Sequence, residues 1–405
     1  MTQDERVLLG QILLDESVYH DSGIKPAQFS DAVSRRIATA ISELISEGVK
    51  PDILNVSQKA GGLEAEIAGL TNVGSSANWK YYHKRVQEAY QGRELERLAS
   101  EIKEHAKNPG SALSMIEDRL LSIYSEGNGS EVVRSWDVAR KVLDRIEARY
   151  KMHGEIPGIP SGISKLDETI LGFEDKKLYY VGARPSVGKS ALLGNFAAAA
   201  CGLGFKTGMI TIESAGTELV TRILATETNI DSRRLMTGRL DEKDFGWLMD
   251  SASKIAEWPL WLYDDPDATI DDVRRRMRQM VLYHGVQIIF VDYVQLIARN
   301  GRSGEYRDRV AECSISLKAA ARSLRIPVVS AAQLTRDSQG RVPTLADFAD
   351  NSQIEKDADV AILIHREKGN YWLKVEKHRD GKTGDVPVTF LPATVRFVNR
   401  AMEEE

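Results

Sequence analysis

A strand-like run, a glycine-containing loop and a helix-like run follow one another at residues 178–200, and they are the strongest chemical signal in this 405-residue chain. The loop ends in Gly188-Lys189-Ser190, directly before a helical pattern. Backbone N–H groups at such a helix start can surround a phosphate, and the helix dipole favours its negative charge. We therefore expect a nucleotide-binding segment made of Ala183, Arg184, Pro185, Ser186, Val187, Gly188, Lys189 and Ser190.

Two side chains of this loop suit the chemistry of a nucleoside triphosphate. Lys189 can reach the β- and γ-phosphates, and the Ser190 hydroxyl can ligate Mg²⁺. Ala183 departs from the general phosphate-loop pattern, which has a glycine at this position, and Gly182 stands one residue earlier. The strand pattern before the loop and the helix pattern after it favour phosphate binding over a chance match.

Polar residues also follow three other apolar, strand-like runs. Glu213 follows 209–212, Asp292 follows 287–291, and Gln333 follows 328–332. Ligands of α/β proteins bind where the strands of a parallel sheet end. We expect Asp292 to hold Mg²⁺ through water, Glu213 to deprotonate the attacking water, and Gln333 to sense the γ-phosphate. The alternative for each residue is an ordinary solvated strand end.

The elements that must position these residues alternate along the second part of the chain. Apolar strands joined by helices indicate an α/β fold with a mostly parallel sheet covered on both faces. Beyond about residue 370, the pattern predicts added antiparallel strands. We expect strands at 178–181, 209–212, 288–291, 328–331, 360–364, 371–376, 386–390 and 395–398, and helices at 191–200, 217–228, 270–283 and 309–324.

The first part of the chain has the periodicity of helices, with Ile37, Ile41, Leu44 and Ile45 on one apolar stripe. A polar linker at 125–130 precedes a helix with a narrow apolar seam, which suits another helix or a groove. Packing of this seam on its own chain is the alternative. The seam residues are Trp136, Ala139, Leu143, Ile146 and Tyr150. We predict an all-α N-terminal docking domain at 1–107, a linker with a docking helix at 108–153, and an α/β domain at 154–405.

The composition excludes several classes of protein. Hydrophobic residues make up 42% and charged residues 28%, as in ordinary globular proteins, and no apolar run approaches the roughly 18 residues of a membrane span. The absence of an export signal and two distant cysteines, Cys201 and Cys313, predict a reducing cytoplasm. A net charge of −5 argues against a small DNA-coating protein, but it allows positive charge to gather on one inward face.

Four segments, in order, resemble the successive motifs of the DnaB-type replicative DNA helicases. They are residues 182–190, 290–297, 330–336 and 352–359. The resemblance extends to 6–15 at the start and to 158–167 before the phosphate loop, so it spans nearly the whole chain. Family members also carry alanine at the first loop position, which accounts for Ala183.

The resemblance implies a homo-hexameric ring of RecA-like P-loop ATPase domains with a helical N-terminal collar and a linker helix that docks on the neighbouring subunit. It implies ATP and Mg²⁺ as cofactors and 5′-to-3′ movement on single-stranded DNA. It also implies that primase and a helicase loader bind through the N-terminal domain, in the cytoplasm of a bacterial cell.

The resemblance also implies roles for single residues. Glu213 matches the family's catalytic glutamate and Gln333 its γ-phosphate sensor. Lys377 and Arg379 match a lysine and an arginine finger that enter the adjacent subunit's site. On the sequence alone, the alternative for this basic pair is an ordinary solvated turn.

Two stretches are candidates for DNA contact. Arginines cluster soon after Asp292 in a glycine-containing stretch that suits phosphate contacts inside a ring. The family's second DNA-binding loop matches 348–353, but its arginine is replaced by Ala349 and its glycine by Ser352. This divergence and the short chain suggest a phage or prophage member. The expected DNA-binding residues are Arg299, Arg302, Arg307, Asp350, Asn351 and Ser352, and Arg309 belongs to the same cluster.

Two other functions are compatible with a phosphate loop. A RecA-like recombinase or scaffold would bind DNA as a filament and use ATP mainly as a switch. A non-motor nucleotide switch would dock a partner through the N-terminal domain. The helical N-terminal domain and the linker helix argue against the recombinase.

Overall fold

The computed structural model describes residues 1–71, 78–105, 135–151, 156–301, 304–335, 341–348 and 352–400, together with Ile116 and Arg119. The chain forms two compact units, residues 1–148 and 149–405. Among the described residues, no helix is long and apolar enough to cross a membrane.

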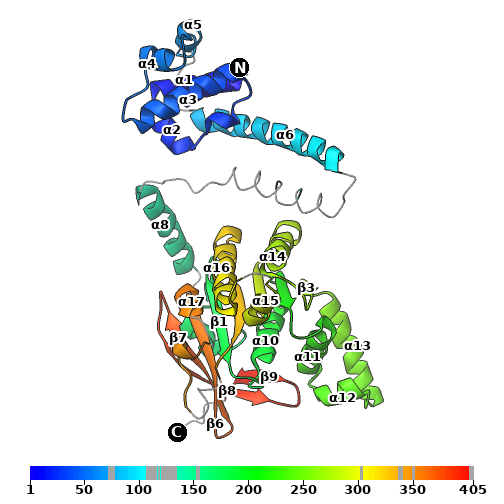
Figure 1. The fold of residues 1–405 in the computed structure, drawn as a ribbon. Helices are drawn as coiled ribbons and strands as arrows, with labels where there is room; N and C mark the ends of the chain where they lie inside the picture. The colour runs from blue at the N-terminus through cyan, green and yellow to red at the C-terminus, as the bar shows by residue number, and fades with distance from the viewer. Residues whose placement is uncertain are drawn as a thin grey trace. The chain divides into compact units, whose positions relative to one another are not determined.

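The first unit is helical, as predicted (Figure 1). Thr2 and Glu5 form a capping box that begins α1, and Asp31 caps α3 by accepting from two backbone N–H groups. The apolar stripe of α3 faces the core, where Ile37 and Ile41 are fully buried. The elements are α1 (Gln3–Leu14), α2 (Ser17–Ser22), η1 (Pro26–Gln28), α3 (Ala32–Ser46), α4 (Ile53–Lys59), α5 (Glu64–Ala68) and α6 (Trp79–His105).

Helix α8 (Ser135–Lys151) begins in the first unit and ends in the second. Near its end, Arg149 pairs with Glu174 of the second unit at 2.9 Å. The predicted apolar seam is exposed along this helix, with Trp136 at 70% and Tyr150 at 82% exposure. Among the described residues, none covers this seam.

The second unit is built on one nine-stranded sheet with the order β3-β2-β4-β5-β1-β6-β7-β8-β9. The first six strands in this order are parallel, and the last three are antiparallel additions. This confirms the predicted α/β class with a mostly parallel sheet. The strands are β1 (Leu178–Ala183), β2 (Thr207–Thr211), β3 (Leu260–Asp264), β4 (Ile288–Asp292), β5 (Val328–Gln333), β6 (Val360–Glu367), β7 (Asn370–His378), β8 (Gly384–Leu391) and β9 (Arg396–Asn399).

Helices cover both faces of this sheet because successive strand residues point to opposite sides. Tyr179 and Phe290 pack in the same core as α9, α10 and α11, whereas Tyr180 and Ile289 pack in the other core with α14, α15 and α16. The helices of this unit are α9 (Ser164–Ile170), α10 (Lys189–Gly202), α11 (Gly216–Thr228), α12 (Ser232–Thr237), α13 (Glu242–Ala256), α14 (Ile270–His284), α15 (Val294–Asn300), α16 (Tyr306–Leu324), η4 (Leu345–Asp347) and α17 (Ser352–Asp357).

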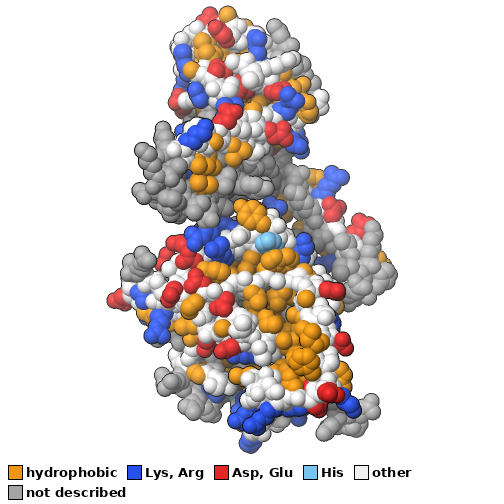
Figure 2. All heavy atoms as spheres, turned by 90° about the vertical axis from the view of Figure 1, so that its right-hand side faces the viewer, with side chains coloured by type: hydrophobic (Ala, Val, Ile, Leu, Met, Phe, Trp, Pro, Cys, Tyr) orange, Lys and Arg blue, Asp and Glu red, His pale blue; other side chains and the backbone are white. Residues whose placement is uncertain are grey.

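The sequence patterns did not predict β3, α12 or α13. Strand β3 lies at the edge of the sheet and is only partly buried. Helix α13 exposes large apolar residues, including Phe245 and Trp247, each 57% exposed. Figure 2, viewed from the side of α13, shows hydrophobic side chains gathered on this face of the second unit.

The aromatic cluster around Phe173 gives a test of the core. Phe173 is 1% exposed, and its ring centroid lies 5.0 Å from Tyr179, 5.3 Å from Phe196 and 6.0 Å from Phe290. We expect Phe173→Ala to lower the free energy of unfolding of the second unit by about 3–5 kcal/mol, because it removes buried surface and leaves a cavity. Phe245→Ala is the matched control and should cost under about 0.5 kcal/mol. Equal unfolding midpoints for both variants would contradict this core.

Candidate active site

The register of the parallel strands gathers the predicted polar residues at one edge of the sheet. Ala183 pairs with Gln333, and Thr211 pairs with Asp292. Glu213 lies two residues beyond Thr211. The neighbouring strands β2, β4, β5 and β1 therefore present Glu213, Asp292, Gln333 and the phosphate loop in that order along the carboxyl edge.

The phosphate loop leads directly from β1 into α10. Gly188 caps the helix at φ +104°, a backbone conformation that L side chains rarely adopt, and a Cβ there would meet the Phe397 ring at 3.0 Å. The backbone of Phe397 is itself held on α10 by a 2.7 Å hydrogen bond from its N–H to Asn195 Oδ1. Position 188 therefore requires glycine, and Phe397 of β9 packs against the phosphate loop.

Lys189 lies at the electrostatic centre of the site. Its Nζ is 3.5 Å from Glu213 Oε2, 3.7 Å from Asp292 Oδ1 and 3.2 Å from the centroid of the Tyr293 ring. Burial lowers the pKa of Lys189 below its usual value, and the two carboxylates offset part of that shift. Burial also raises the pKa of Tyr293 to about 12, so this ring stays neutral beside the ammonium group.

Asp292 and Ser190 suit a magnesium ion shared with phosphate oxygens. Asp292 is 1% exposed, and among the described residues its Oδ1 has no hydrogen-bond partner, with the Lys189 ammonium group 3.7 Å away. This oxygen can therefore accept a further cation or donor, and Mg²⁺ is commonly held by one or two protein oxygens plus phosphates and water. Ser190, at the second position of α10, supplies a hydroxyl oxygen from the phosphate loop.

The backbone of Gln333 is held by Gln295, a residue for which the sequence predicted no role. Gln295 Nε2 donates to the Gln333 carbonyl oxygen at 3.0 Å, and Gln295 Oε1 accepts from the Gln333 N–H at 3.1 Å. Gln295 is 5% exposed. Both Gln295 and Tyr293 belong to the segment 290–297. Their position just after Asp292 was the sequence signal that could have placed them in the site.

Lys377 and Arg379 lie at the opposite edge of the sheet from Lys189. Strand β7 runs antiparallel to β6 and pairs His378 with Val360, so its end lies beside the start of β1. The six residues of β1 span roughly 17 Å. Within one chain, these two cations are therefore separated from the phosphate loop by the length of the strand. Burial lowers the pKa of Lys377, and the charge of Arg379 lowers it further.

The candidate DNA-binding residues are only partly described. Arg299, in the last turn of α15, and Arg307, near the start of α16, are exposed. Arg309 instead braces these helices, because its Nε donates to the Ala298 carbonyl oxygen at 2.8 Å. Ser352 is the first residue of α17. The other expected residues, Arg302, Asp350 and Asn351, lie outside the described residues.

A phosphate loop, a glutamate, an aspartate and a glutamine on adjacent parallel strands define a P-loop ATPase with a RecA-like core. Similarity to known proteins agrees with this class. The chain matches the "DnaB-like helicase C terminal domain" over residues 158–399 and the "DnaB-like helicase N terminal domain" over residues 1–88. It is 32% identical to the replicative DNA helicase DnaB of Treponema pallidum, over 97% of this chain and 94% of that protein.

Two solved structures are similar. A DnaB-like replicative helicase, described with its interactions with primase, matches with a TM-score of 0.66 at 23% identity, over 98% of this chain and 100% of that chain. A separately solved ATPase domain matches with a TM-score of 0.62 at 25% identity, over 65% of this chain and 99% of that chain.

The chain belongs to the DnaB-like helicase family, and it is an ATP-dependent replicative DNA helicase. Membership decides against the recombinase and the non-motor switch. The family match also confirms the helical N-terminal domain and the RecA-like ATPase fold that the sequence motifs implied.

The position of Glu213 generates a prediction. We expect Glu213→Gln to retain ATP binding and to lower turnover by about 10²–10⁴-fold, because the amide keeps the volume but cannot accept the proton of the attacking water. Fluorescent-nucleotide titration and steady-state ATPase assays measure the two quantities. Glu218→Gln, on the exposed side of α11, is the matched control. Loss of binding together with turnover would make Glu213 a structural residue.

Proposed function

We propose that this chain works as a homo-hexameric ring that encircles single-stranded DNA and hydrolyses ATP between adjacent subunits. The observation that supports this most is the division of the chemical groups between two edges of one sheet. Lys189, Glu213 and Asp292 lie at the carboxyl edge, whereas Arg379 lies beside the start of β1. A second copy must supply Arg379 if it acts on the nucleotide.

Within one subunit, the proposed roles follow from position. The loop from Ala183 to Ser190 holds the phosphates, with Lys189 neutralising the β- and γ-phosphates. Ser190 and, through water, Asp292 would hold Mg²⁺, which would supply further charge neutralisation. Glu213 removes a proton from the attacking water, and Gln333 senses the γ-phosphate. When phosphate enters, it takes over the ammonium group that Glu213 and Asp292 now share.

Arg379 and Lys377 complete the site of the neighbouring subunit. An arginine finger stabilises the charge that develops on the transferred phosphoryl group, and its planar guanidinium suits several phosphate oxygens at once. Arg379 suits this role because its side chain is 47% exposed at the end of β7.

The ring is assembled, in this proposal, through the exposed seam of α8, which docks on a second copy of the chain. Residues 1–107 form the collar, 108–153 the linker with its docking helix, and 154–405 the motor. The collar receives primase and a helicase loader, in the cytoplasm of a bacterial cell. One similar solved structure is described by its interactions with primase, which supports the first of these partners. The altered loop at 348–353 favours a phage or prophage origin.

DNA passes, we infer, along the residues that follow β4 and β5. Arg299 lies in α15 and Arg307 in α16, and Ser352 is the first residue of α17. Arg302, Asp350 and Asn351 stand between or next to these positions in the sequence, outside the described residues. Arginine side chains and backbone N–H groups can bind phosphates without reading the base sequence.

Mixed rings test the trans finger. Arg379→Ala subunits and Lys189→Ala subunits should each be almost inactive alone, since losing an arginine finger commonly costs about 10³–10⁵ in rate. Mixing them creates interfaces that combine an intact phosphate loop with an intact finger. We expect single-turnover hydrolysis to recover in these mixtures, with assembly confirmed by mass in the same samples.

Single-turnover measurement is needed because some rings hydrolyse ATP only when every site acts in sequence. In such a ring, steady-state assays would not detect the recovered activity of single interfaces. Mixtures of Lys189→Ala with Lys189→Ala/Arg379→Ala subunits are the control, since they contain no intact phosphate loop. Assembled mixed rings without recovery would leave Arg379 acting within its own subunit or not at all.

The DNA contact gives a separate prediction. Arg307→Ala should weaken single-strand binding about equally for all sequences and lower the slope of log K against log salt by about 0.7. Arg233→Ala, which removes an exposed arginine of α12, is the matched control and should leave the slope unchanged. The same slope for both variants and the parent would place Arg307 away from the DNA.

A further inference from the structure

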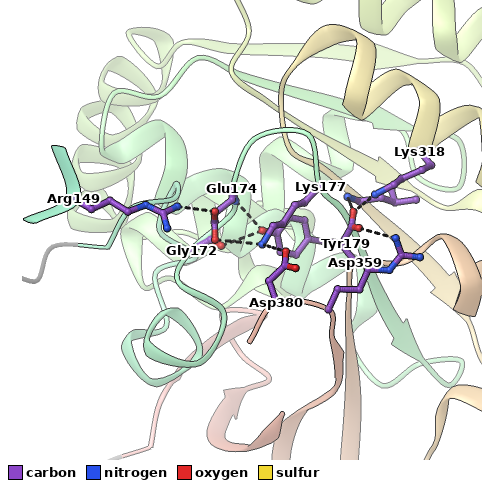
Figure 3. Close-up of polar contacts among 10 residues, drawn as sticks. Arg149, Gly172, Glu174, Lys177, Tyr179, Lys318, Asp359 and Asp380 are labelled. Carbon is purple, nitrogen blue, oxygen red and sulfur yellow. Dashed lines mark hydrogen bonds and ion pairs between the residues drawn. The ribbon is translucent and has the colours of Figure 1, made fainter. Parts of the chain in front are cut away.

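Asp359 connects the finger segment to the start of β1. It is 7% exposed, and it lies between the end of α17 and β6. Its Oδ2 accepts the Leu178 N–H at 2.7 Å and also pairs with Lys318 of α16, while its Oδ1 lies 3.4 Å from Arg379 Nη1. Figure 3 shows Asp359 with Lys318 at one side of this network. One buried carboxylate thus pairs with the cations of Lys318 and Arg379 and accepts a hydrogen bond from the first residue of β1.

Backbone carbonyls next to Asp359 hold the same segment. The Arg379 N–H donates to the Asp359 carbonyl oxygen at 2.9 Å, and the Arg379 guanidinium also donates to the Lys356 carbonyl oxygen. The Lys377 ammonium donates to the Glu355 carbonyl oxygen. Both basic residues are therefore held by the end of α17 and the residues that follow it. A guanidinium has five N–H donors, more than these contacts use.

The turn beyond Arg379 is tied down separately. Lys177 Nζ lies 3.0 Å from Asp380 Oδ2, and Figure 3 shows this pair beside Glu174. Asp380 is 70% exposed, so this ion pair lies at the surface, where such pairs contribute little. Asp359 is buried and Asp380 is not. Of these two carboxylates next to the finger, Asp359 is the one that can fix its geometry.

We propose that Asp359 is a positioning residue for Arg379, holding the guanidinium in the orientation in which it reaches the nucleotide of the neighbouring subunit. This inference rests on the proposed trans finger. Without such a contact, a flexible arginine at an interface would have to be ordered each time a nucleotide binds. A displacement of the catalytic group by about 1 Å can lower the rate about a hundredfold. Asp359 itself touches neither nucleotide nor DNA in this scheme.

Asp359→Asn and Asp380→Asn form a matched pair, since each removes one carboxylate charge beside the finger. We expect Asp359→Asn to slow single-turnover ATP hydrolysis by about ten- to a hundredfold in assembled rings, with nucleotide affinity unchanged. Asp380→Asn should stay within about twofold of the parent. Equal rates for Asp359→Asn and the parent would overturn the proposal.

Asp359→Asn leaves the partly buried Lys318 without its carboxylate, and an unpaired charge of this kind can prevent folding. The double variant Asp359→Asn/Lys318→Met removes both charges and should show the same slow hydrolysis. A double variant that assembles and hydrolyses ATP at the parent rate would overturn the proposal. So would failure of both variants to assemble, since Asp359 would then serve the fold.

Mixed rings separate positioning from a structural role in the same subunit. Asp359→Asn subunits keep their own phosphate loop, whereas Lys189→Ala subunits keep Asp359 and Arg379. Mixing them should restore hydrolysis if Asp359 acts through its own finger on a neighbour. No recovery here, when Arg379→Ala with Lys189→Ala does recover, would overturn the positioning role alone. Failure of that second mixture would overturn the trans finger, and the positioning role with it.

Discussion

The chemistry of this protein depends on the parallel register of four neighbouring strands. That register pairs Ala183 with Gln333 and Thr211 with Asp292. A shift by one residue would turn every side chain to the other face of the sheet. The same shift would exchange Phe290, which packs in one core, with Ile289, which packs in the other. The packing of two hydrophobic cores therefore also sets where the polar strand ends meet.

Charge balance explains why such a site is stable before ATP arrives. A buried ammonium or carboxylate alone would be costly, but Lys189 lies between Glu213 and Asp292 and over the face of Tyr293. The groups are thus already gathered where phosphate and Mg²⁺ are proposed to bind. At the far edge of the sheet, Asp359 does the same for Lys318 and Arg379.

The sequence was sufficient to predict an element or a residue's position wherever the signal lies in a short run of residues. The phosphate loop, Asp292 and the buried strands follow from short runs of residues. Glu213 and Gln333 needed only the rule that parallel strands end together. Two contacts could not be predicted: the hydrogen bonds from Gln295 to the backbone of Gln333, and the hydrogen bond from Arg309 to α15. Each joins segments that only the fold brings together. Strand β3, a partly buried edge strand, and helix α13 were not predicted.

The antiparallel return of β7 has a genetic consequence. Strand β7 carries Arg379 to the edge opposite Lys189. With the proposed trans finger, a subunit with a damaged β7 end would keep its own nucleotide pocket intact and silence the pocket of its neighbour. The lesion and its effect would then lie in different copies of the chain. In a cell that makes both normal and damaged copies, each altered subunit would inactivate a healthy one, and the mutation would be dominant.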